Sequence, residues 1–307
     1  MLKIMPTINK ILKTSILEKT MYILLVVLII IVLYNTFKSS SCKKEGFRVN
    51  KTYVYKTDND IFDDFYASIY DVLVYNKIRN QFEIGSIIDT TTPNSESIIL
   101  DISTRTGHHV NQLNNITKNV IGIDTSIAMI NKSRENYPSL EFAAADPLDN
   151  QAFEPNSFTH ILSLNNNIYY LDDKKMFFNN CYNWLMTGGY LIISLTDRDR
   201  LNPVNTIVNI KSNLLPSFVD PTLLIDKTVK FKDFSYKPDY KPLGTDIVVL
   251  NERFKYNNGD IRENEHKLYI KDKPSILKMA TNAGFIVLKM YDLKEIGFNS
   301  YMYVLQK

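Results

Sequence analysis

The chain has 307 residues, of which 45% are hydrophobic and 22% charged, proportions that are ordinary for a globular protein. Its formal net charge of +3 is too small to indicate a nucleic-acid partner, which would require basic residues gathered on one surface. The two cysteines, Cys42 and Cys181, lie far apart and provide neither a disulfide framework nor a cysteine-based metal cluster. This cysteine usage fits a reducing compartment.

The first predicted element is an uncharged apolar segment, Met21 to Phe37, which follows a leader of residues 1–20. Together with the preceding threonine it spans about 18 residues, enough for a helix to cross a hydrocarbon core. A cleaved signal peptide is the alternative interpretation. Against it, bulky Phe37 and charged Lys38 stand where small residues should precede a cleavage site. We therefore predict a single-pass transmembrane helix over residues 21–37.

Basic residues flank this predicted anchor unequally. Four lysines precede it, and six basic residues follow it up to Lys56, which favours a cytoplasmic position for the C-terminal side. Residues 38–57 are polar and basic and are interpreted as a juxtamembrane linker. The remainder, residues 58–307, is predicted to form the folded domain.

The folded part begins with a helical pattern and continues with alternating strands and helices. Apolar and aromatic residues recur at helical spacing from Ile61 to about Ile88, which predicts one or two amphipathic helices. Short apolar runs then predict strands at 97–102, 119–124, 140–146, 158–164 and 190–196. The helices predicted between them are 109–116, 126–136 and 174–185. This alternation indicates a parallel sheet that is covered on both faces.

The pattern changes after Asp197. Residues 198–273 are predicted to form an inserted antiparallel β cap, with strands at 227–236, 246–256 and 263–270. Asn257 to Asp260 supply a hairpin turn between the last two of these strands. A helix over 275–285, closed by Gly284, and two strands at 286–293 and 300–307 complete the chain.

Three aspartates stand at the ends of successive predicted parallel strands. Asp101 ends the first strand, Asp124 the second and Asp146 the third. Each of them alone is ordinary as a helix cap or turn residue. Together they fall where doubly wound sheets bind their ligands, and an acid after the second strand can accept both hydroxyls of a ribose. The set therefore indicates a nucleoside-bearing ligand.

Five motifs in order resemble those of class I S-adenosylmethionine-dependent methyltransferases. They are SIILDISTRTGHHV, NVIGIDTSIAMINKSRENYP, LEFAAADPLD, FEPNSFTHILSLNNNIYYLDD and NWLMTGGYLIISL. The resemblance covers about residues 62–196, and the elements after Ser275 match the usual ending of the family. It implies a doubly wound, mostly parallel seven-stranded sheet of the Rossmann-like methyltransferase type, into which the antiparallel cap is inserted. It also implies S-adenosyl-L-methionine as the cofactor.

The resemblance assigns cofactor-binding positions to Asp101, Ser103, Arg105, Gly107, Asp124, Thr125, Met129, Asp146, Pro147 and Asn165. By this assignment Asp101, Ser103 and Gly107 lie in the loop that holds the methionine portion. Asp124 binds the ribose hydroxyls, with the next two residues of the set beside the adenosine. Asp146 bonds the adenine amino group, and the last residue of the set faces the methyl group and the acceptor.

The loop after the first strand departs from the family pattern of acid-x-Gly-x-Gly-x-Gly. Ser103 and Arg105 occupy the first two glycine positions, and only Gly107 remains. Glycine is used there because a side chain would meet the cofactor or oppose the backbone dihedrals. Two outcomes are open: Arg105 turns outward or pairs with the cofactor's carboxylate, or it fills the pocket. Thr159 also stands where the family usually has aspartate.

No catalytic base and no metal site can be named from the sequence. Methyl transfer from a sulfonium depends mainly on positioning, and an amine acceptor requires no strong base. The candidates near the acceptor are His160, Tyr169, Tyr170 and His266. His160 reads as a core residue and the tyrosines equally as packing residues. We expect His266, Glu252 and Arg262 to be exposed charges on paired strands, and His108 and His109 to serve solvent or cap roles.

Two functions follow. The first is a membrane-anchored methyltransferase whose acceptor is a small molecule or a lipid-like, membrane-associated one, because several members of this class place such a cap over the acceptor. The second is a catalytically inactive scaffold protein in a membrane. The Asn-, Ile- and Lys-rich composition suggests an A+T-rich genome, and a viral membrane component is one interpretation. A third rival, a dinucleotide or nucleotide-sugar oxidoreductase, would require more of the glycine fingerprint.

Overall fold

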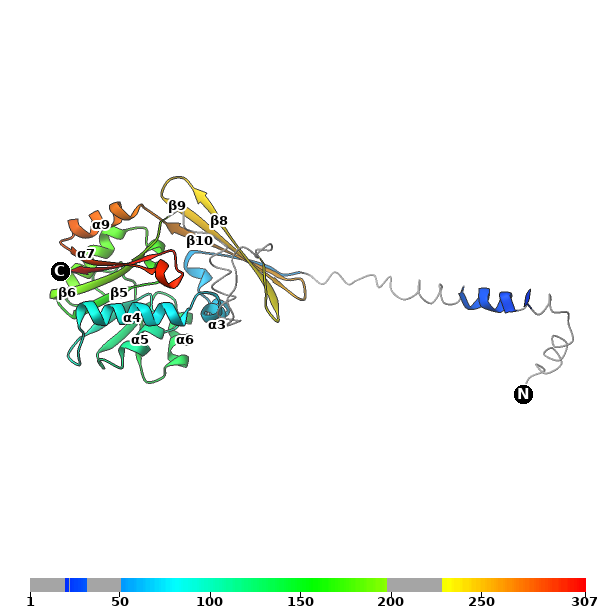
Figure 1. Ribbon diagram of the computed structural model, residues 1–307, viewed down its shortest axis with the longest axis horizontal. Coiled ribbons are helices and arrows are strands. Elements are labelled where there is room, and N and C mark those ends of the chain that lie inside the picture. Colours follow the sequence, from blue (N-terminus) through cyan, green and yellow to red (C-terminus); the bar gives the residue numbers. More distant parts are fainter. Residues whose placement is uncertain (1–19, 22, 32–50, 198–227) are drawn as a thin grey trace. The chain divides into compact units, whose positions relative to one another are not determined.

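The computed structural model describes residues 20, 21, 23–31, 51–197 and 228–307, and the chain divides into two units, Met1–Lys51 and Thr52–Lys307 (Figure 1). In the first unit, residues 20, 21 and 23–31 are helical. The rest of the predicted anchor, the leader up to residue 19 and residues 38–50 of the predicted linker lie outside the described residues. Among the residues described, no helix has the length and apolar character needed to cross a membrane.

The second unit contains a seven-stranded sheet. Its strands are β2 (Ile99–Ile102), β3 (Val120–Asp124), β4 (Glu141–Ala144), β5 (Phe158–Ser163), β6 (Leu185–Leu195), β11 (Ile286–Asp292) and β12 (Tyr301–Gln306). They lie in the order β11-β12-β6-β5-β2-β3-β4. The five strands from β6 to β4 are parallel, whereas β12 is antiparallel to both of its neighbours. The predicted mostly parallel, doubly wound sheet is confirmed.

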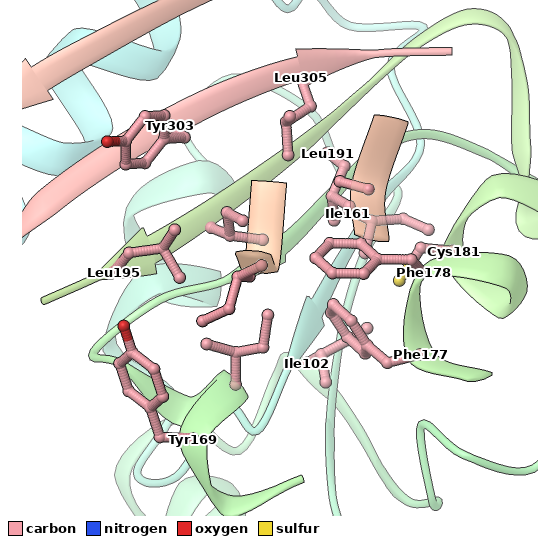
Figure 2. Close-up of a cluster of buried hydrophobic side chains, with 14 of the residues drawn as sticks. Ile102, Ile161, Tyr169, Phe177, Phe178, Cys181, Leu191, Leu195, Tyr303 and Leu305 are labelled. Atoms are coloured by element: carbon pink, nitrogen blue, oxygen red, sulfur yellow. The ribbon is translucent and has the colours of Figure 1, made fainter. Parts of the chain in front are cut away.

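Helices cover both faces of this sheet (Figure 1). They are α4 (Lys77–Thr91), α5 (His108–Leu113) and α6 (Ile127–Asn136) on one face, and α7 (Lys174–Trp184) and α9 (Lys273–Asn282) on the other. Successive strand residues point to opposite faces, so that Ile99 packs in the core under α4 and α5 while Leu100 packs in the core under α7 and α9. Figure 2 shows this second core, where Phe177, Phe178 and Cys181 of α7 lie against the sheet.

Short polar side chains fix where several of these helices begin. Ser126 accepts from the backbone N–H of Met129 at the start of α6, and Asp173 does the same for Met176 at the start of α7. Asp272 caps α9 in the same way. Such caps satisfy N–H groups that have no partner within the helix, and the helix therefore starts at a defined residue after each strand.

A second, smaller sheet forms the cap. Its strands are β1 (Tyr53–Thr57), β7 (Val229–Lys230), β8 (Phe234–Leu243), β9 (Ile247–Tyr256) and β10 (Ile261–Tyr269), in the order β1-β10-β9-β8-β7. The strands β7 to β10 are antiparallel, as predicted, but β1 joins the sheet parallel to β10. Residues 53–57 were expected in the linker. That expectation was wrong, because their backbone pairs with a strand more than 200 residues further along the chain.

Helix α3 (Asp64–Leu73), which follows the short 3-10 helix η1 (Asp58–Ile61), lies against the cap. A third hydrophobic cluster joins Phe62, Tyr66 and Tyr70 to Tyr236 of β8 and Phe254 of β9. The predicted helical region over residues 61–88 thus contains two helices, one packed on the cap and one on the main sheet.

Strand β11 forms one edge of the main sheet and exposes apolar side chains to solvent. Ile286, Leu288 and Met290 are all exposed. The register with β12 shifts between Val287 and Lys289, which leaves Leu288 without a partner in the strand pairing.

Candidate functional site

Three loops meet where the order of the parallel strands reverses, between β2 and β5. The helices that follow β2 and β3 lie on one face of the sheet, and the helix that follows β5 lies on the other face. Open α/β sheets bind their ligands at such a reversal, outside the carboxyl ends of the strands. We call this region the switch-point site and define it by residues 101–107 after β2, Asp124 at the end of β3, and residues 165–167 after β5.

The loop after β2 has the backbone of a glycine-rich loop although it retains one glycine. Ser103 has φ 57°, Arg105 φ 56° and Gly107 φ 86°, all in the left-handed region that favours glycine. The loop is held by hydrogen bonds from Thr104 N to Ile123 O at 2.8 Å and from Gly107 N to Thr104 O at 3.0 Å. Two of these three left-handed positions therefore carry residues with side chains.

Gly107 is required by contact as well as by conformation. A Cβ at this position would lie 2.7 Å from Cζ of Phe142, a buried residue of β4. Gly107 is also the N-cap residue of α5. Its retention follows from the close packing of the loop against the sheet.

Asp124 is buried at the centre of the switch-point site. Its Oδ1 accepts from Ser126 N at 2.9 Å, and its Oδ2 accepts from Arg105 N at 3.2 Å. The guanidinium of Arg105 lies close to the same Oδ2, with Nη1 at 3.6 Å. The carboxylate that was predicted to bind a ribose is therefore paired with a residue of the neighbouring loop.

The side chain of Arg105 points into the site rather than outward. Only 6% of the residue is exposed. Nη2 donates to Asn167 Oδ1 at 3.2 Å, and the guanidinium carbon lies 3.9 Å from the centre of the Phe62 ring and 5.3 Å from that of Tyr170. Of the outcomes that the sequence left open, the structure shows the filled site.

Asp101 lies beneath this loop and is also buried. Burial raises the pKa of its carboxyl to about 6, and its Oδ2 has no hydrogen-bond partner in the described part of the chain. A buried ionic cluster that was not predicted lies nearby: Glu83 accepts from Arg79 Nε at 2.8 Å and pairs with His109 Nε2 at 3.0 Å. His109 was expected in a solvent or cap role, and its burial corrects that expectation.

The remaining predicted cofactor residues lie at the edge of the site or in the core. Thr125 and Asp146 are exposed, and Asp146 accepts from Leu148 N in a local turn. Met129 is fully buried in the cluster that contains Phe62. Pro147 is buried, and its carbonyl accepts from the side chain of Asn180. Asn165, with φ 54°, lines a small cavity beside Arg105.

A buried polar network lies next to the switch-point site and had been expected in solvent. Glu252 of β9 pairs with His266 Nε2 at 2.7 Å, and His266 Nδ1 lies 3.1 Å from the hydroxyl of Tyr170. Glu252 also accepts from the hydroxyls of Tyr66 and Tyr236. Although burial opposes ionisation, the charge of His266 and these hydrogen bonds hold the pKa of Glu252 below its usual value.

Arg262 is likewise buried, where it bonds Asp63 with Nη1 at 2.8 Å. The expectation of exposed strand-pair charges for Glu252, Arg262 and His266 was wrong, because this face of the cap packs on α3 instead of facing water. One sequence feature indicates this burial. The aromatic Phe254 lies two positions from Glu252 on β9 and pairs with Arg262 on β10, so it shares a face of the sheet with these polar residues.

His160 and Thr159 have structural roles. His160 is buried within β5, and burial lowers its pKa to about 4, which keeps the ring neutral at physiological pH. Thr159, which replaces the aspartate usual in the family, accepts from Ile98 N and donates to Ile98 O. It therefore ties β5 to the residue before β2. Tyr169 is buried and donates to Thr196 O, as expected of a packing residue.

Residues 99–189 match a family model described as a methyltransferase domain. No curated protein matches the chain. Among solved structures, a S-adenosylmethionine-dependent methyltransferase from Clostridium acetobutylicum is 17% identical, with a TM-score of 0.59 over 79% of this chain and 98% of that one. The domain has the fold of a S-adenosylmethionine-dependent methyltransferase.

Two sugar-modifying enzymes share this methyltransferase fold. CalS10, an amino pentose methyltransferase from Micromonospora echinaspora, is 15% identical, with a TM-score of 0.55 over 79% of this chain and 96% of its own. KedS8, a sugar N-methyltransferase from Streptoalloteichus sp., is 15% identical, with a TM-score of 0.55 over 78% of this chain and 92% of its own.

A methyltransferase domain of this kind implies S-adenosylmethionine as its cofactor. Asp101 and Asp124 are both buried in the switch-point site, and the Asp101 oxygen that has no partner among the described residues fits a polar ligand. The space beside Arg105 is too small for the cofactor. The cavity that this side chain lines with Tyr70 and Asn165 has a volume of about 20 Å³, whereas ligand sites usually measure at least about 300 Å³. With the Arg105 side chain in this position, that cavity does not admit the cofactor.

Proposed function

We propose that this protein is a S-adenosylmethionine-dependent methyltransferase that acts on a small-molecule acceptor. The observation that supports this most is the buried Asp124 at the end of β3, beside a loop in which Ser103, Arg105 and Gly107 all have a left-handed backbone. The family match over residues 99–189 supports the same activity.

A small-molecule acceptor is supported by the cap and by the structural neighbours. CalS10 and KedS8 are described as acting on an amino pentose and on a sugar nitrogen, and both resemble this chain over more than three quarters of its length. The cap strands β8, β9 and β10 pack beside the switch-point site through α3 and Tyr170. A cap in this position limits the space for an acceptor and favours a compact one over a polymer.

Binding of the cofactor tests this function. The full-length chain, with and without Asp124→Asn, is titrated by calorimetry with S-adenosylmethionine and with S-adenosylhomocysteine. We expect saturable binding by the native chain that the Asp124→Asn variant loses, because the carboxylate accepts the ribose hydroxyls. Retention of the fold by the variant is checked by circular dichroism. Equal binding by both chains would contradict the assignment of Asp124.

A second function, that of a catalytically inactive scaffold, is favoured by one specific observation: Arg105 fills the space that the cofactor would need. This function predicts that the native chain binds neither S-adenosyl compound even at millimolar concentration. It also predicts no methyl transfer to amine or hydroxyl acceptors from radiolabelled cofactor. The same titration therefore separates the two functions.

We further propose that residues 21–37 anchor the protein in a membrane with the folded unit on the cytoplasmic side. The support is the uncharged apolar sequence, of which the described residues 23–31 are helical and expose their side chains. The full-length chain should remain with membranes after alkaline carbonate extraction, whereas a fragment of Thr52–Lys307 should be released. Release of the full-length chain would contradict the anchor.

A further inference from the structure

We propose that Arg105 is an internal occupant of the switch-point site, whose guanidinium takes the place of the cofactor's ribose against Asp124 and must leave before the cofactor binds. This inference rests on the proposed function and adds a condition to it. Four properties of the site support it: the charge of Asp124, the aromatic contacts of Arg105, the cavity volume and the backbone conformation of the loop.

The charge of Arg105 is matched by the group that a ribose would use. Asp124 Oδ2 is 3.6 Å from Nη1 of Arg105, and Asn167 Oδ1 accepts from Nη2 at 3.2 Å. A buried guanidinium is tolerated only where a charge and hydrogen bonds compensate its desolvation. Because Asp124 provides that compensation, the cofactor and Arg105 compete for the same carboxylate.

Two aromatic rings also contact the guanidinium. The Phe62 ring lies 3.9 Å from the guanidinium carbon and the Tyr170 ring 5.3 Å from it, distances at which the ring faces attract a cation. Phe62 is fixed in turn, since its carbonyl accepts from Ser126 Oγ at 2.5 Å. The contacts of Arg105 thus come from three separate segments, before α3, at the end of β3 and after β5.

The space beside the side chain is too small for a second occupant. The cavity that Arg105 lines together with Tyr70 and Asn165 measures about 20 Å³, which is room for a single water molecule. A nucleoside cannot enter this cavity unless the Arg105 side chain moves.

The backbone shows that the position is built for glycine. Arg105 has φ 56°, a left-handed conformation that residues with a side chain rarely adopt. Glycine adopts it freely, so that Arg105→Gly removes the occupant without requiring the loop to change its path. Asn156, with φ 56° in a turn before β5, offers a matched control outside the switch-point site, because Asn156→Gly relieves the same kind of strain and leaves Arg105 in place.

The first experiment compares the full-length native chain, Arg105→Gly and Asn156→Gly by calorimetric titration with S-adenosylhomocysteine. An occupant that fills the site most of the time weakens the apparent affinity by the fraction of open molecules. We expect Arg105→Gly to bind at least about tenfold more tightly than the native chain and Asn156→Gly to bind as the native chain does. Equal affinities of the native chain and Arg105→Gly would overturn the inference and leave the proposed function intact.

The second experiment needs no cofactor. Ethylguanidinium chloride at low millimolar concentration should raise the melting temperature of Arg105→Gly, because the free cation re-enters between Phe62, Tyr170 and Asp124. The native chain and Asn156→Gly should show no rise, and sodium chloride at equal ionic strength should not substitute. Absence of a rise in Arg105→Gly would overturn the inference. A rise with no binding of either S-adenosyl compound would support the occupant and refute the proposed function.

Discussion

Three residues of the loop after β2 share one backbone conformation, although only Gly107 is a glycine. The left-handed φ angles of Ser103 and Arg105 are retained because hydrogen bonds of the loop and contacts of Arg105 hold them. Such strain persists only where surrounding structure over-determines it, and it concentrates at sites that bind or react. The strained backbone of this loop therefore marks it as a candidate binding loop.

Gly107 should tolerate substitution less well than another glycine of similar conformation. Gly107→Ala places a methyl group 2.7 Å from the Phe142 ring and opposes φ 86°, which should lower the free energy of unfolding by about 3 kcal/mol. Gly188→Ala, at φ 77° with open space around it, should cost about 1 kcal/mol. Urea unfolding of both variants measures the difference. Equal losses would show that the contact with Phe142 is not limiting.

Asp101 should make stability depend on pH. Its pKa is raised from 3.8 to about 6, so the folded state holds the proton more tightly than the unfolded state does. Stability therefore falls as pH rises between these two values, and a penalty of about 3 kcal/mol remains above them. In Asp101→Asn this penalty is absent, so the stability gain over the native chain should grow from pH 4 to pH 6 and then stay constant. Urea unfolding across this range measures it, and a gain independent of pH would contradict the buried ionisation.

The pairing of β9 with β10 places charged residues on the inner face of the cap, where Glu252 lies opposite Asn264 and near His266. Four side chains satisfy the carboxylate, and helix α3 covers it. A buried carboxylate of this kind contributes less through its own energy than through the cost of leaving its partners unpaired. It therefore specifies how the cap seats on α3.

Glu252→Gln should lower the free energy of unfolding by about 3 kcal/mol at neutral pH, since it removes the charge that pairs with His266. Because the pKa of Glu252 is below its usual value, this contribution is present at neutral pH and is lost only as the pH falls through that lowered pKa. The variant's deficit should accordingly be constant from pH 6 to pH 8. Chemical denaturation at several pH values measures it.

Glu263→Gln on the adjacent strand is the matched control for this change. Glu263 pairs with Arg253 near the surface, with side chains that are 34% and 54% exposed. An exposed pair contributes less than about 1 kcal/mol. Equal deficits in the two variants would show that burial of Glu252 is not what makes it important.

The parallel strands and the positions of Asp101 and Asp124 at their ends could be predicted because they follow from local patterns, apolar runs that alternate with helices and end in acids. The direction of the Arg105 side chain could not be predicted, because it depends on contacts with Phe62 and Tyr170, which come from segments remote in the sequence. The burial of Glu252 and His266 was missed for the same reason. Alternation shows which residues share a face of a strand but not whether that face meets water or a helix. The pairing of β1 depends on β10, which lies over 200 residues away.

The stability of the folded unit should depend on β1, whose sequence alone predicts part of a linker. A fragment of residues 52–307 should unfold in a single transition, and a fragment of residues 58–307 should be less stable by about 1 kcal/mol or more, because the edge of β10 loses its partner strand. Tyr53 and Tyr55 also lose their hydrogen bonds to Glu263 and Glu265. Thermal and urea unfolding of the two fragments measures the loss. Equal stabilities of the two fragments would show that residues 53–57 do not contribute to the stability of the folded unit.

The open edge at β11 bears on how the protein behaves when many copies are present. Ile286, Leu288 and Met290 project into solvent beside backbone groups that another strand could bond, a combination that invites chains to add to one another. The irregular pairing at Val287 and the charged Lys289 interrupt that template. Solubility at high concentration therefore depends in part on the Lys289 ammonium group at the rim of the sheet, and Lys289→Val should make the protein precipitate at a lower concentration than the native chain.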